Sequence, residues 1–298
     1  MVPTRARDGD EQCLFVRSDR LFYKLNFCTM DFLGLKDKHI ILTGIANRRS
    51  IAAAVAKTLR EAGADLLYVF KDEALRDKNL PLLGDNPRCA ICNVAREEEM
   101  ENLRTAVQNW APQVDGLVHS IAFANYSEGI KPYHDTLKAD FLQAVDISCF
   151  SLTSLCHHLQ STFSREASIV TLSISTTRMA STSYGYMGPI KAALDSSVVF
   201  LAKSLTERLS PDIRVNAVGA SPLKTSASAG IPGYIDSYLY AEKATLRHRA
   251  LQTEEAANIV AFLLSPRSSG INAQTIIADA GMSCNYFDDS LVRPSAGK

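Results

Sequence analysis

The feature that most constrains the fold is a regular alternation of short apolar runs and longer amphipathic segments between His39 and Ala278. The apolar runs have the length of strands, and the segments between them repeat apolar residues at helical spacing. Strands that alternate with helices form a parallel sheet with helices on both faces, so we expect a single-domain, doubly wound parallel α/β sheet of the Rossmann-like type. In such a sheet a ligand binds at the carboxyl ends of the strands. We predict strands at 39–43, 66–70, 90–94, 116–120, 169–173, 213–218 and 274–278, and helices at 50–62, 97–110, 139–163, 184–209 and 254–264.

The domain is expected to span residues 30–285, because no linker, repeat or low-complexity run interrupts that stretch. Residues 1–29 differ from it, since they mix basic and acidic side chains and carry no periodic apolar pattern. We expect this segment to be a disordered arm, or the product of a start upstream of Met30. Residues 286–298 are expected to form a C-terminal tail.

Composition argues against several classes of function. The formal net charge is +0 and no basic block is present, which argues against a nucleic-acid partner because phosphate contacts need a surplus of Lys and Arg. No apolar run reaches the roughly 18–20 residues that cross a membrane. The seven cysteines are odd in number, which favours a reducing, cytoplasmic location. Cys89 and Cys92 form a C-x-x-C pair without a second pair of ligands, so we predict no metal site.

A nucleotide site is predicted at the turn after the first strand of the domain. Gly44 permits a tight turn there, and Ser50 and Ile51 begin the helix that follows. The free N–H groups of a helix start can hold a pyrophosphate. The turn has one glycine rather than the three of the G-x-G-x-x-G pattern, so an ordinary strand–helix turn is the alternative.

The end of the second strand bears on the choice of cofactor. An acidic residue at this point favours NAD because it bonds a ribose hydroxyl, whereas a cation accommodates the extra phosphate of NADP. Lys71 and Asp72 stand there side by side and favour opposite cofactors. An exposed pair of opposite charges explains the two residues equally well, so the choice stays open at this point.

Tyr184 and Lys191 are the candidate catalytic pair. Seven residues are nearly two helical turns, so both side chains are expected on the same face of the 184–209 helix. A phenol at that place can hydrogen-bond a substrate carbonyl oxygen, and a nearby ammonium can stabilise charge and hold a ribose. Pro189 lies one turn inside the predicted helix, where it does little harm.

From about Met30 to Met282 the chain resembles the enoyl-acyl-carrier-protein reductases, a branch of the short-chain dehydrogenase/reductases. Carbonyl reductases of that superfamily carry Tyr-x3-Lys, which would need a tyrosine where Met187 stands, so the spacing favours enoyl over ketone reduction. The order and spacing of short stretches carry the resemblance: Thr43-Gly44 with Ser50-Ile51-Ala52, residues 119–124, Asp146-Ile147-Ser148, Leu172-Ser173, Tyr184-x6-Lys191 with Met187-Gly188, residues 214–217, Pro222-x-x-Thr225 and Asp279-x-Gly281.

The resemblance implies that a nicotinamide cofactor, NADH or alternatively NADPH, gives hydride to the β-carbon of a trans-2-enoyl thioester on acyl carrier protein during fatty-acid elongation. It implies that Tyr184 hydrogen-bonds the thioester oxygen, that Lys191 holds the nicotinamide ribose and that Ala124 touches the substrate. It also implies a homotetramer in which the 139–163 and 184–209 helices pack between subunits. The implied cofactor contacts are Gly44, Ser50, Ile51, Lys71, Asn93, Val94, Ile121, Lys191, Leu223, Lys224, Thr225, Ser226 and Ala227.

Several positions depart from the family pattern. Ile174 stands ten residues before Tyr184, where the family has a second aromatic residue and ketone-reducing relatives have serine. Asn93 replaces an aspartate at the adenine, an exchange that keeps a hydrogen-bond acceptor. Ala122, Ser221 and Ala280 replace glycines, and a methyl group at Ala122 is expected to crowd the nicotinamide end.

The substrate lid is expected at residues 226–249, and it has no cation before Lys243. The family carries basic residues early in this segment, so we expect activity on a carrier-bound substrate to depend only weakly on salt. The alternative is that Lys243, Arg247, His248 and Arg249 dock the acidic carrier. Two other functions stay open: a divergent reductase of another activated alkene or ketone, and a weakly catalytic nucleotide-binding homologue.

Overall fold

The computed structural model describes residues 13–18, 21–26, 31–181, 184–225, 228, 231 and 233–292. They fall into two compact units, one that ends at Phe32 and one that begins at Leu33. In the first unit, β1 (Cys13–Ser18) and β2 (Leu21–Asn26) pair as antiparallel strands. The sequence predicts no strand in this segment, because charged residues lie among its apolar residues.

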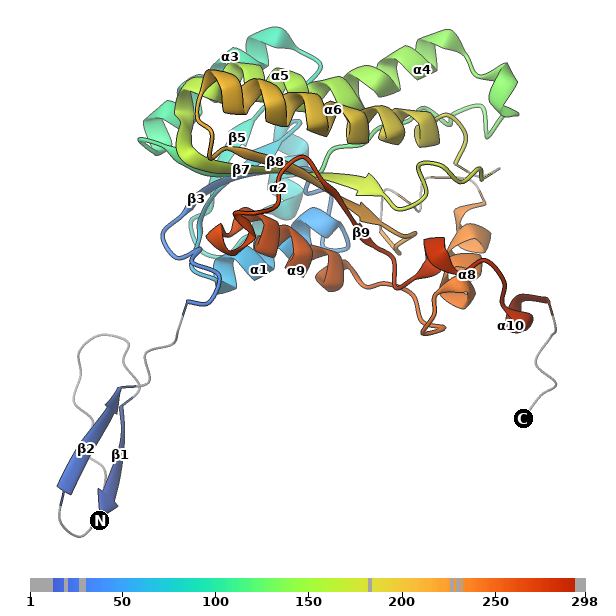
Figure 1. Ribbon diagram of the computed structural model, residues 1–298. Helices are drawn as coiled ribbons and strands as arrows, with labels where there is room; N and C mark the ends of the chain where they lie inside the picture. Colours follow the sequence, from blue (N-terminus) through green and yellow to red (C-terminus); the bar gives the residue numbers. More distant parts are fainter. Residues whose placement is uncertain are drawn as a thin grey trace. The chain divides into compact units, whose positions relative to one another are not determined.

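In the second unit, seven strands of the described chain form one parallel sheet in the order β5-β4-β3-β6-β7-β8-β9 (Figure 1). The order reverses between β3 and β6, which is the switch point of a doubly wound sheet. The predicted fold class is confirmed. The strands are β3 (His39–Thr43), β4 (Asp65–Phe70), β5 (Arg88–Ile91), β6 (Val114–His119), β7 (Phe163–Ile174), β8 (Arg214–Ala220) and β9 (Thr275–Ala278).

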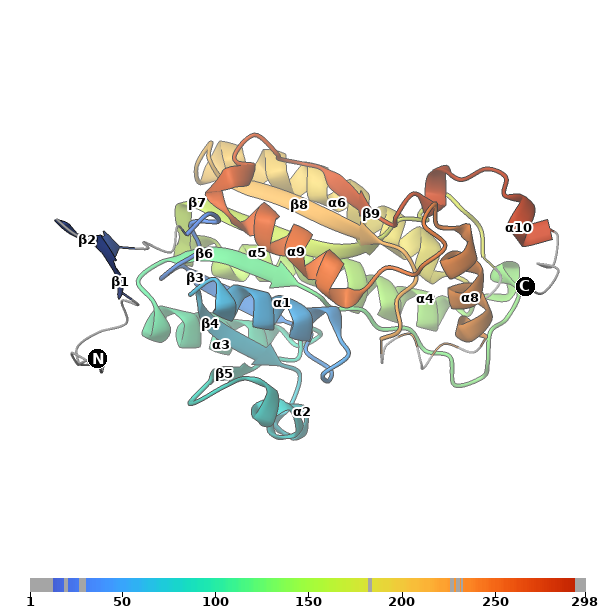
Figure 2. The ribbon, with the colours of Figure 1, turned by 90° about the horizontal axis from the view of Figure 1, so that it is seen from below.

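Helices cover both faces of this sheet (Figures 1 and 2). On one face α1 (Ile51–Glu61) and α9 (Thr253–Leu264) pack together, and on the other lie α3 (Glu97–Trp110), α5 (Ser151–Leu159) and α6 (Met187–Arg208). The strand side chains alternate between the two apolar cores. Ile40 and Leu42 join the core under α1 and α9, whereas Ile41 joins the core under the other three helices.

The predicted 139–163 helix is wrong in its continuity and in its end. The structure has α4 (Lys138–Val145), a π-helical turn (Asp146–Phe150) and α5, and Phe163 already begins β7. Neither glycine nor proline marks the stop, and the apolar pattern runs on into the strand, so the sequence conceals the boundary. A π-turn is common near functional sites, and here it lies beside the carboxyl end of β6.

Three α-helices of the described chain are absent from the sequence-based prediction. α2 (Glu73–Asn79) is almost entirely polar, and α10 (Asp289–Val292) is a single turn. α8 (Tyr234–Ala244) buries only Tyr238, Ala241 and Ala244, so its apolar stripe is narrow. Because such segments bury little apolar surface, hydrophobic periodicity does not reveal them.

The carboxyl ends of the strands gather the predicted site residues at one edge of the sheet. Gly44 follows β3, Lys71 follows β4, Asn93 lies just after β5, and Ile121 follows β6. These four residues therefore lie at the carboxyl-terminal edge of the sheet, where the sequence predicts the ligand. No helix in the described part of the chain combines the length and the apolar character that a membrane crossing requires.

Candidate active site

Gly44 forms the tightest approach at the switch point. Its φ is +89°, a conformation that favours glycine, and a Cβ atom built on it would lie 1.9 Å from the carbonyl oxygen of Ser120. The hydroxyl of Thr43 ties the same two strands together, since it donates to the Val118 carbonyl at 2.9 Å and accepts from the Ser120 N–H at 3.3 Å. The backbones of Gly44 and Ser120 therefore approach each other too closely to admit a side chain at position 44.

Ser50 caps α1, as the sequence predicts. Its hydroxyl accepts from the Ala53 N–H at 3.3 Å and donates to the Asn47 carbonyl at 2.7 Å. In the described structure the N–H groups of Ile51 and Ala52 have no acceptor within the protein. They lie at the start of an 11-residue helix, where the helix dipole favours an anion.

A hollow opens at the ends of β4 and β5. Lys71, Asp72, Asn93, Arg96 and Glu99 contribute to its lining. The Asn93 N–H donates to Glu99 at 2.6 Å, and the Asn93 side-chain oxygen accepts from the Ala95 N–H at 3.2 Å. The structure thus places Lys71 and Asn93 in one hollow, where the resemblance puts the adenosine end of the cofactor.

Asp72 is the N-cap of α2, and this resolves part of the ambiguity at the end of β4. Its carboxylate accepts from the Leu75 N–H at 2.8 Å. Lys71 is exposed and has no hydrogen bond or ion pair within the described residues. The two charges are therefore not a matched surface pair, because one stabilises a helix and the other is free to meet a ligand.

The prediction that Tyr184 lies within a helix is wrong, because α6 begins at Met187. Tyr184 lies in the turn before it, where its carbonyl oxygen accepts from the Met187 N–H at 3.2 Å. The glycine that follows, Gly185, has a φ of +52°, which breaks the helical path. The Tyr184 ring is half-buried against the core under α6, together with Ile121 and Ala124. Burial raises the pKa of its phenol, so the hydroxyl stays protonated at neutral pH.

Lys191 is 4% exposed, which is unusual for a lysine. Its ammonium donates to the Leu172 carbonyl at the end of β7 at 2.7 Å, and the described residues offer it no second acceptor. Burial lowers its pKa to about 8, although the neighbouring Asp195 carboxylate acts in the opposite direction. The ammonium therefore keeps unused donor capacity inside the site.

His119 was not identified from the sequence, although it is fully buried at the end of β6. One ring nitrogen lies 2.8 Å from the Thr171 hydroxyl and the other 2.8 Å from the Ser151 hydroxyl. The Ser151 hydroxyl also lies 2.7 Å from the Ile147 carbonyl, and the Thr171 hydroxyl lies 3.3 Å from the His119 carbonyl, so each hydroxyl also reaches a backbone acceptor. Burial, together with the charge of Lys191, lowers the pKa of His119 to about 3. The imidazole is therefore a neutral structural link between β6, β7 and α5.

The π-turn fixes the loop that carries Ile121 and Ala124. Ser148 lies in this turn and is fully buried, and its hydroxyl accepts from the Phe123 N–H at 2.8 Å and donates to the Phe123 carbonyl at 3.0 Å. These two hydrogen bonds to Phe123 fix the loop between β6 and α4 to the π-turn. In the sequence, Asp146-Ile147-Ser148 counts only among the stretches that carry the resemblance, and no role is predicted for Ser148.

The predicted cofactor segment at 223–227 is described as far as Thr225, so Ser226 and Ala227 lie outside the described residues. The backbone of Leu223 both donates to and accepts from the Tyr234 hydroxyl, at 2.8 and 3.0 Å. The Ser228 hydroxyl donates to the Leu223 and Thr225 carbonyls. Lys224 lies over the Tyr238 ring at 4.5 Å. This segment is therefore tied to α8, which belongs to the predicted lid.

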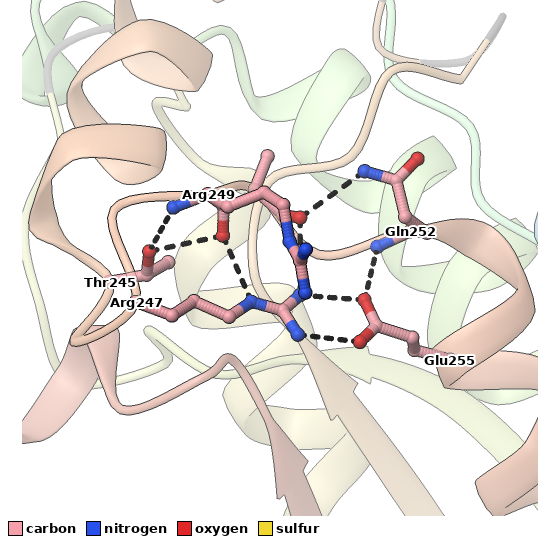
Figure 3. Close-up of polar contacts among 6 residues, drawn as sticks. Thr245, Arg247, Arg249, Gln252 and Glu255 are labelled. Carbon is pink, nitrogen blue, oxygen red and sulfur yellow. Dashed lines mark hydrogen bonds and ion pairs between the residues drawn. The ribbon is translucent and has the colours of Figure 1, made fainter.

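Arg247 is committed to internal contacts (Figure 3). Its guanidinium makes two bonds of 2.6 Å to Glu255, and it also donates to the Arg249 and Ala250 carbonyls at 3.1 Å. Glu255 in turn accepts from the Gln252 N–H at 2.8 Å, and the hydrogen bond from Arg247 lowers its pKa to about 2. The alternative in which Arg247 docks an acidic carrier is therefore disfavoured, because its donors already join the lid to the start of α9.

The departures from the family pattern have different structural consequences. Ile174 ends β7 opposite Ala220 and offers no polar atom to the site. Ser221 is buried and its N–H bonds the Ala278 carbonyl at 3.1 Å, while Ala122 is exposed. Ala280 has a φ of +52°, so its methyl group stands in a conformation that costs a residue other than glycine about 1–2 kcal/mol.

Known proteins match this chain over most of its length. The family model described as Enoyl-(Acyl carrier protein) reductase matches residues 44–283. The enoyl-[acyl-carrier-protein] reductase [NADH] FabI of Nostoc sp. is 35% identical over 254 residues, which cover 84% of this chain and 97% of the relative. The enoyl-[acyl-carrier-protein] reductase [NADPH] FabI of Staphylococcus aureus is 34% identical, with coverage of 84% and 98%. The crystal structure of FabI from Candidatus Liberibacter asiaticus superposes with a TM-score of 0.81 at 30% identity, covering 85% of this chain and 98% of that one. The reductase from Anaplasma phagocytophilum, solved in complex with NAD, gives a TM-score of 0.80 at 25% identity, with coverage of 89% and 98%.

Proposed function

The chain belongs to the enoyl-[acyl-carrier-protein] reductase family, and from that premise we propose that it reduces trans-2-enoyl thioesters on acyl carrier protein with NAD(P)H in fatty-acid synthesis. The observation that carries the proposal is the pairing of a half-buried, protonated Tyr184 with a buried Lys191 whose donors are not filled. Lys191 bonds the carboxyl end of β7, and Tyr184 lies in the turn that precedes the same helix, α6. A divergent reductase and a weakly catalytic homologue remain the alternatives that the assay below separates.

The residues at the strand ends suit a dinucleotide. At Gly44 any side chain would collide with Ser120, so only backbone faces a ligand at this turn. The free N–H groups of Ile51 and Ala52 suit a pyrophosphate. Lys191 has donors left for a ribose hydroxyl. When bound, the reduced nicotinamide supplies the hydride.

Tyr184 is proposed as the hydrogen-bond donor to the thioester oxygen. Because burial raises its pKa, the phenol carries its proton at neutral pH and donates to the oxygen as negative charge develops there. The Lys191 ammonium lowers the cost of that charge and is proposed to orient the ribose. Ala124 is proposed to contact the acyl chain, as the family resemblance implies.

We propose NADH as the cofactor, with NADPH as the alternative, since relatives of both names match this chain. Lys71 is the residue whose charge separates the two, because it is free to meet a 2′-phosphate. Replacing Lys71 with Ala should raise KM for NADPH and leave KM for NADH unchanged. Equal KM values for both cofactors in both proteins would show that Lys71 does not reach the ribose.

A homotetramer and a cytoplasmic location are part of the proposal. Leu142, Phe150, Val199 and Phe200 expose large apolar side chains on α4, the π-turn and α6, and Phe200 is 74% exposed. Such side chains on neighbouring helices suit a contact between subunits. Light scattering of the purified protein measures the oligomer directly. The unpaired cysteines of the described chain suit a reducing compartment.

Tyr184→Phe tests the assignment of the donor. We expect cofactor affinity to stay intact and turnover to fall by roughly 10–1000-fold, the range for losing one transition-state hydrogen bond. The measurement is oxidation of the reduced cofactor with crotonyl thioesters on carrier protein and on coenzyme A. A wild-type protein that binds cofactor but reduces neither thioester would contradict the proposed function, and an unaltered rate in the variant would move the donor elsewhere.

A further inference from the structure

Two tyrosines outside the proposed chemistry hold the Tyr184 turn in a reciprocal way. The Tyr126 hydroxyl donates to the Tyr184 carbonyl at 3.2 Å, and the Tyr186 hydroxyl donates to the Asn125 carbonyl at 2.9 Å. The two rings pack together with centroids 5.8 Å apart. Each tyrosine thus bonds a backbone carbonyl within two residues of the other tyrosine. Two hydrogen bonds and one ring contact therefore join the loop after β6 to the turn before α6.

Both ends of this contact are anchored in the fold. Tyr186 is 7% exposed and packs against Phe141 of α4 at 6.4 Å between ring centroids. The Asn125 side chain donates to Asp140 of α4 at 2.9 Å. The loop after β6, the start of α6 and the helix α4 therefore meet at one point.

The position of Tyr184 depends on its backbone. Its own hydroxyl makes no hydrogen bond to the described residues, and Ile174 at the neighbouring strand end has no polar atom to offer. The Tyr184 N–H bonds the Ser181 carbonyl at 3.4 Å, which is a long contact, whereas its carbonyl holds both the Met187 N–H and the Tyr126 hydroxyl. The contacts that fix this residue are thus concentrated on its carbonyl group.

We propose that Tyr126 and Tyr186 act as positioning residues, forming a clasp that sets the Tyr184 phenol at the height the reaction needs. The proposal rests on the proposed function, because it assigns the clasp to the reactive turn of that site. Small displacements of a reacting group lower rates steeply, so loosening the clasp should affect turnover more than binding.

Single hydroxyl deletions test the clasp with the rings retained. Tyr126→Phe and Tyr186→Phe should each lower kcat about five- to tenfold, as expected for one lost hydrogen bond that positions a reacting group. KM for the cofactor should stay within about twofold, because the loss is confined to the transition state. Tyr133→Phe is the matched control, since Tyr133 lies on the same connection between β6 and α4, is 56% exposed, and bonds through its backbone only. Wild-type kcat in both clasp variants would overturn the proposal.

A double-mutant cycle separates positioning from a general loss of stability. In a Tyr184→Phe background, Tyr126→Phe should lower the remaining rate by less than about twofold, because both changes act on one group. An undiminished effect in that background would overturn the proposal. Amide hydrogen exchange gives a readout without activity: the amides of Met187 and Ile190, which donate to the Tyr184 and Tyr186 carbonyls, should exchange faster in both clasp variants and at the wild-type rate in Tyr133→Phe. Unchanged exchange in the clasp variants would overturn the clasp, whether or not the wild type reduces an enoyl thioester. If the wild type reduces no enoyl thioester but exchange changes as expected, only the proposed function is contradicted.

Discussion

Replacing Lys191 with Met should raise the free energy of unfolding of the cofactor-free domain relative to the wild type at pH 7. The same replacement should abolish cofactor binding. Lys191 is 4% exposed, and burial lowers its pKa from 10.5 to about 8. Each unit of pKa shift corresponds to about 1.4 kcal/mol, so the buried ammonium costs the folded state about 3 kcal/mol at pH 7. Methionine has a similar length and no charge. The variant also loses the bond to the Leu172 carbonyl, which offsets roughly 1–3 kcal/mol of the stability gained by removing the charge. A measurement at a single pH therefore does not isolate the effect of the charge.

The pH dependence isolates the charge. Below pH 8 the lysine is protonated in both folded and unfolded chains, and the full cost is present. Between pH 8 and 10.5 the folded state releases its proton first, so the unfolded state binds more protons and wild-type stability rises with pH. The stability of the variant relative to the wild type should therefore fall by about 2.5 kcal/mol from pH 7 to pH 10. This pH-dependent difference is set by the folded and unfolded pKa values of Lys191 alone, so the bond to Leu172 needs no separate term in it.

Urea unfolding at one protein concentration, without cofactor, measures this difference at pH 7 and pH 10. Lys203→Met is the matched control, because Lys203 lies on the same helix, is exposed, and pairs with Glu207 on the surface. Its stability relative to the wild type should change little with pH over this range. Parallel pH curves for Lys191→Met and the wild type would refute the reasoning, since they would mean that Lys191 has an ordinary pKa in the folded state.

Three further outcomes are expected. Arg247→Ala should lower the melting temperature, because Glu255 and two backbone carbonyls lose their hydrogen-bond donor. The salt dependence of the rate on a carrier-bound substrate should stay unchanged, and a flatter salt dependence in the variant would show that Arg247 docks the carrier. Ala280→Gly should raise the free energy of unfolding by about 1 kcal/mol in urea titration by relieving the positive φ, and a loss of stability would contradict that reading. Removing residues 1–29 should shift the melting temperature by less than about 3 °C in calorimetry, because the chain divides into two compact units near this point; a larger fall would show that the arm packs on the domain.

The sequence was sufficient where local signals and burial agree. β3 and α3 have the bounds that the pattern predicts, and Ser50 caps α1 as expected, because caps and apolar periodicity are local properties. The place of the site also followed from the alternation of strands and helices. Topology fixes which strand ends meet, so the strand ends that carry Gly44 and Lys71 are expected at one edge. Asn93 is assigned to the cofactor by the resemblance alone, and the predicted strand 90–94 contains it, whereas β5 ends at Ile91.

The parts that escaped prediction depend on contacts between distant residues. His119 bonds Thr171 and Ser151, which lie 52 and 32 positions away, and no local pattern relates them. Tyr184 was placed inside a helix because its spacing to Lys191 fits two turns, yet Gly185 adopts a positive φ that ends the helix early. Glycine is compatible with either conformation, so the sequence alone does not decide between them.

The helix cap at Asp72 also limits how coenzyme preference can evolve or be redesigned. A direct exchange of Asp72 for a cation would remove the acceptor of the Leu75 N–H and destabilise α2 by about 1 kcal/mol. Serine or threonine can replace the cap, but neither supplies positive charge. A cation that binds the additional phosphate of NADPH therefore costs less stability at a neighbouring residue that caps no helix. Lys71 is already such a residue.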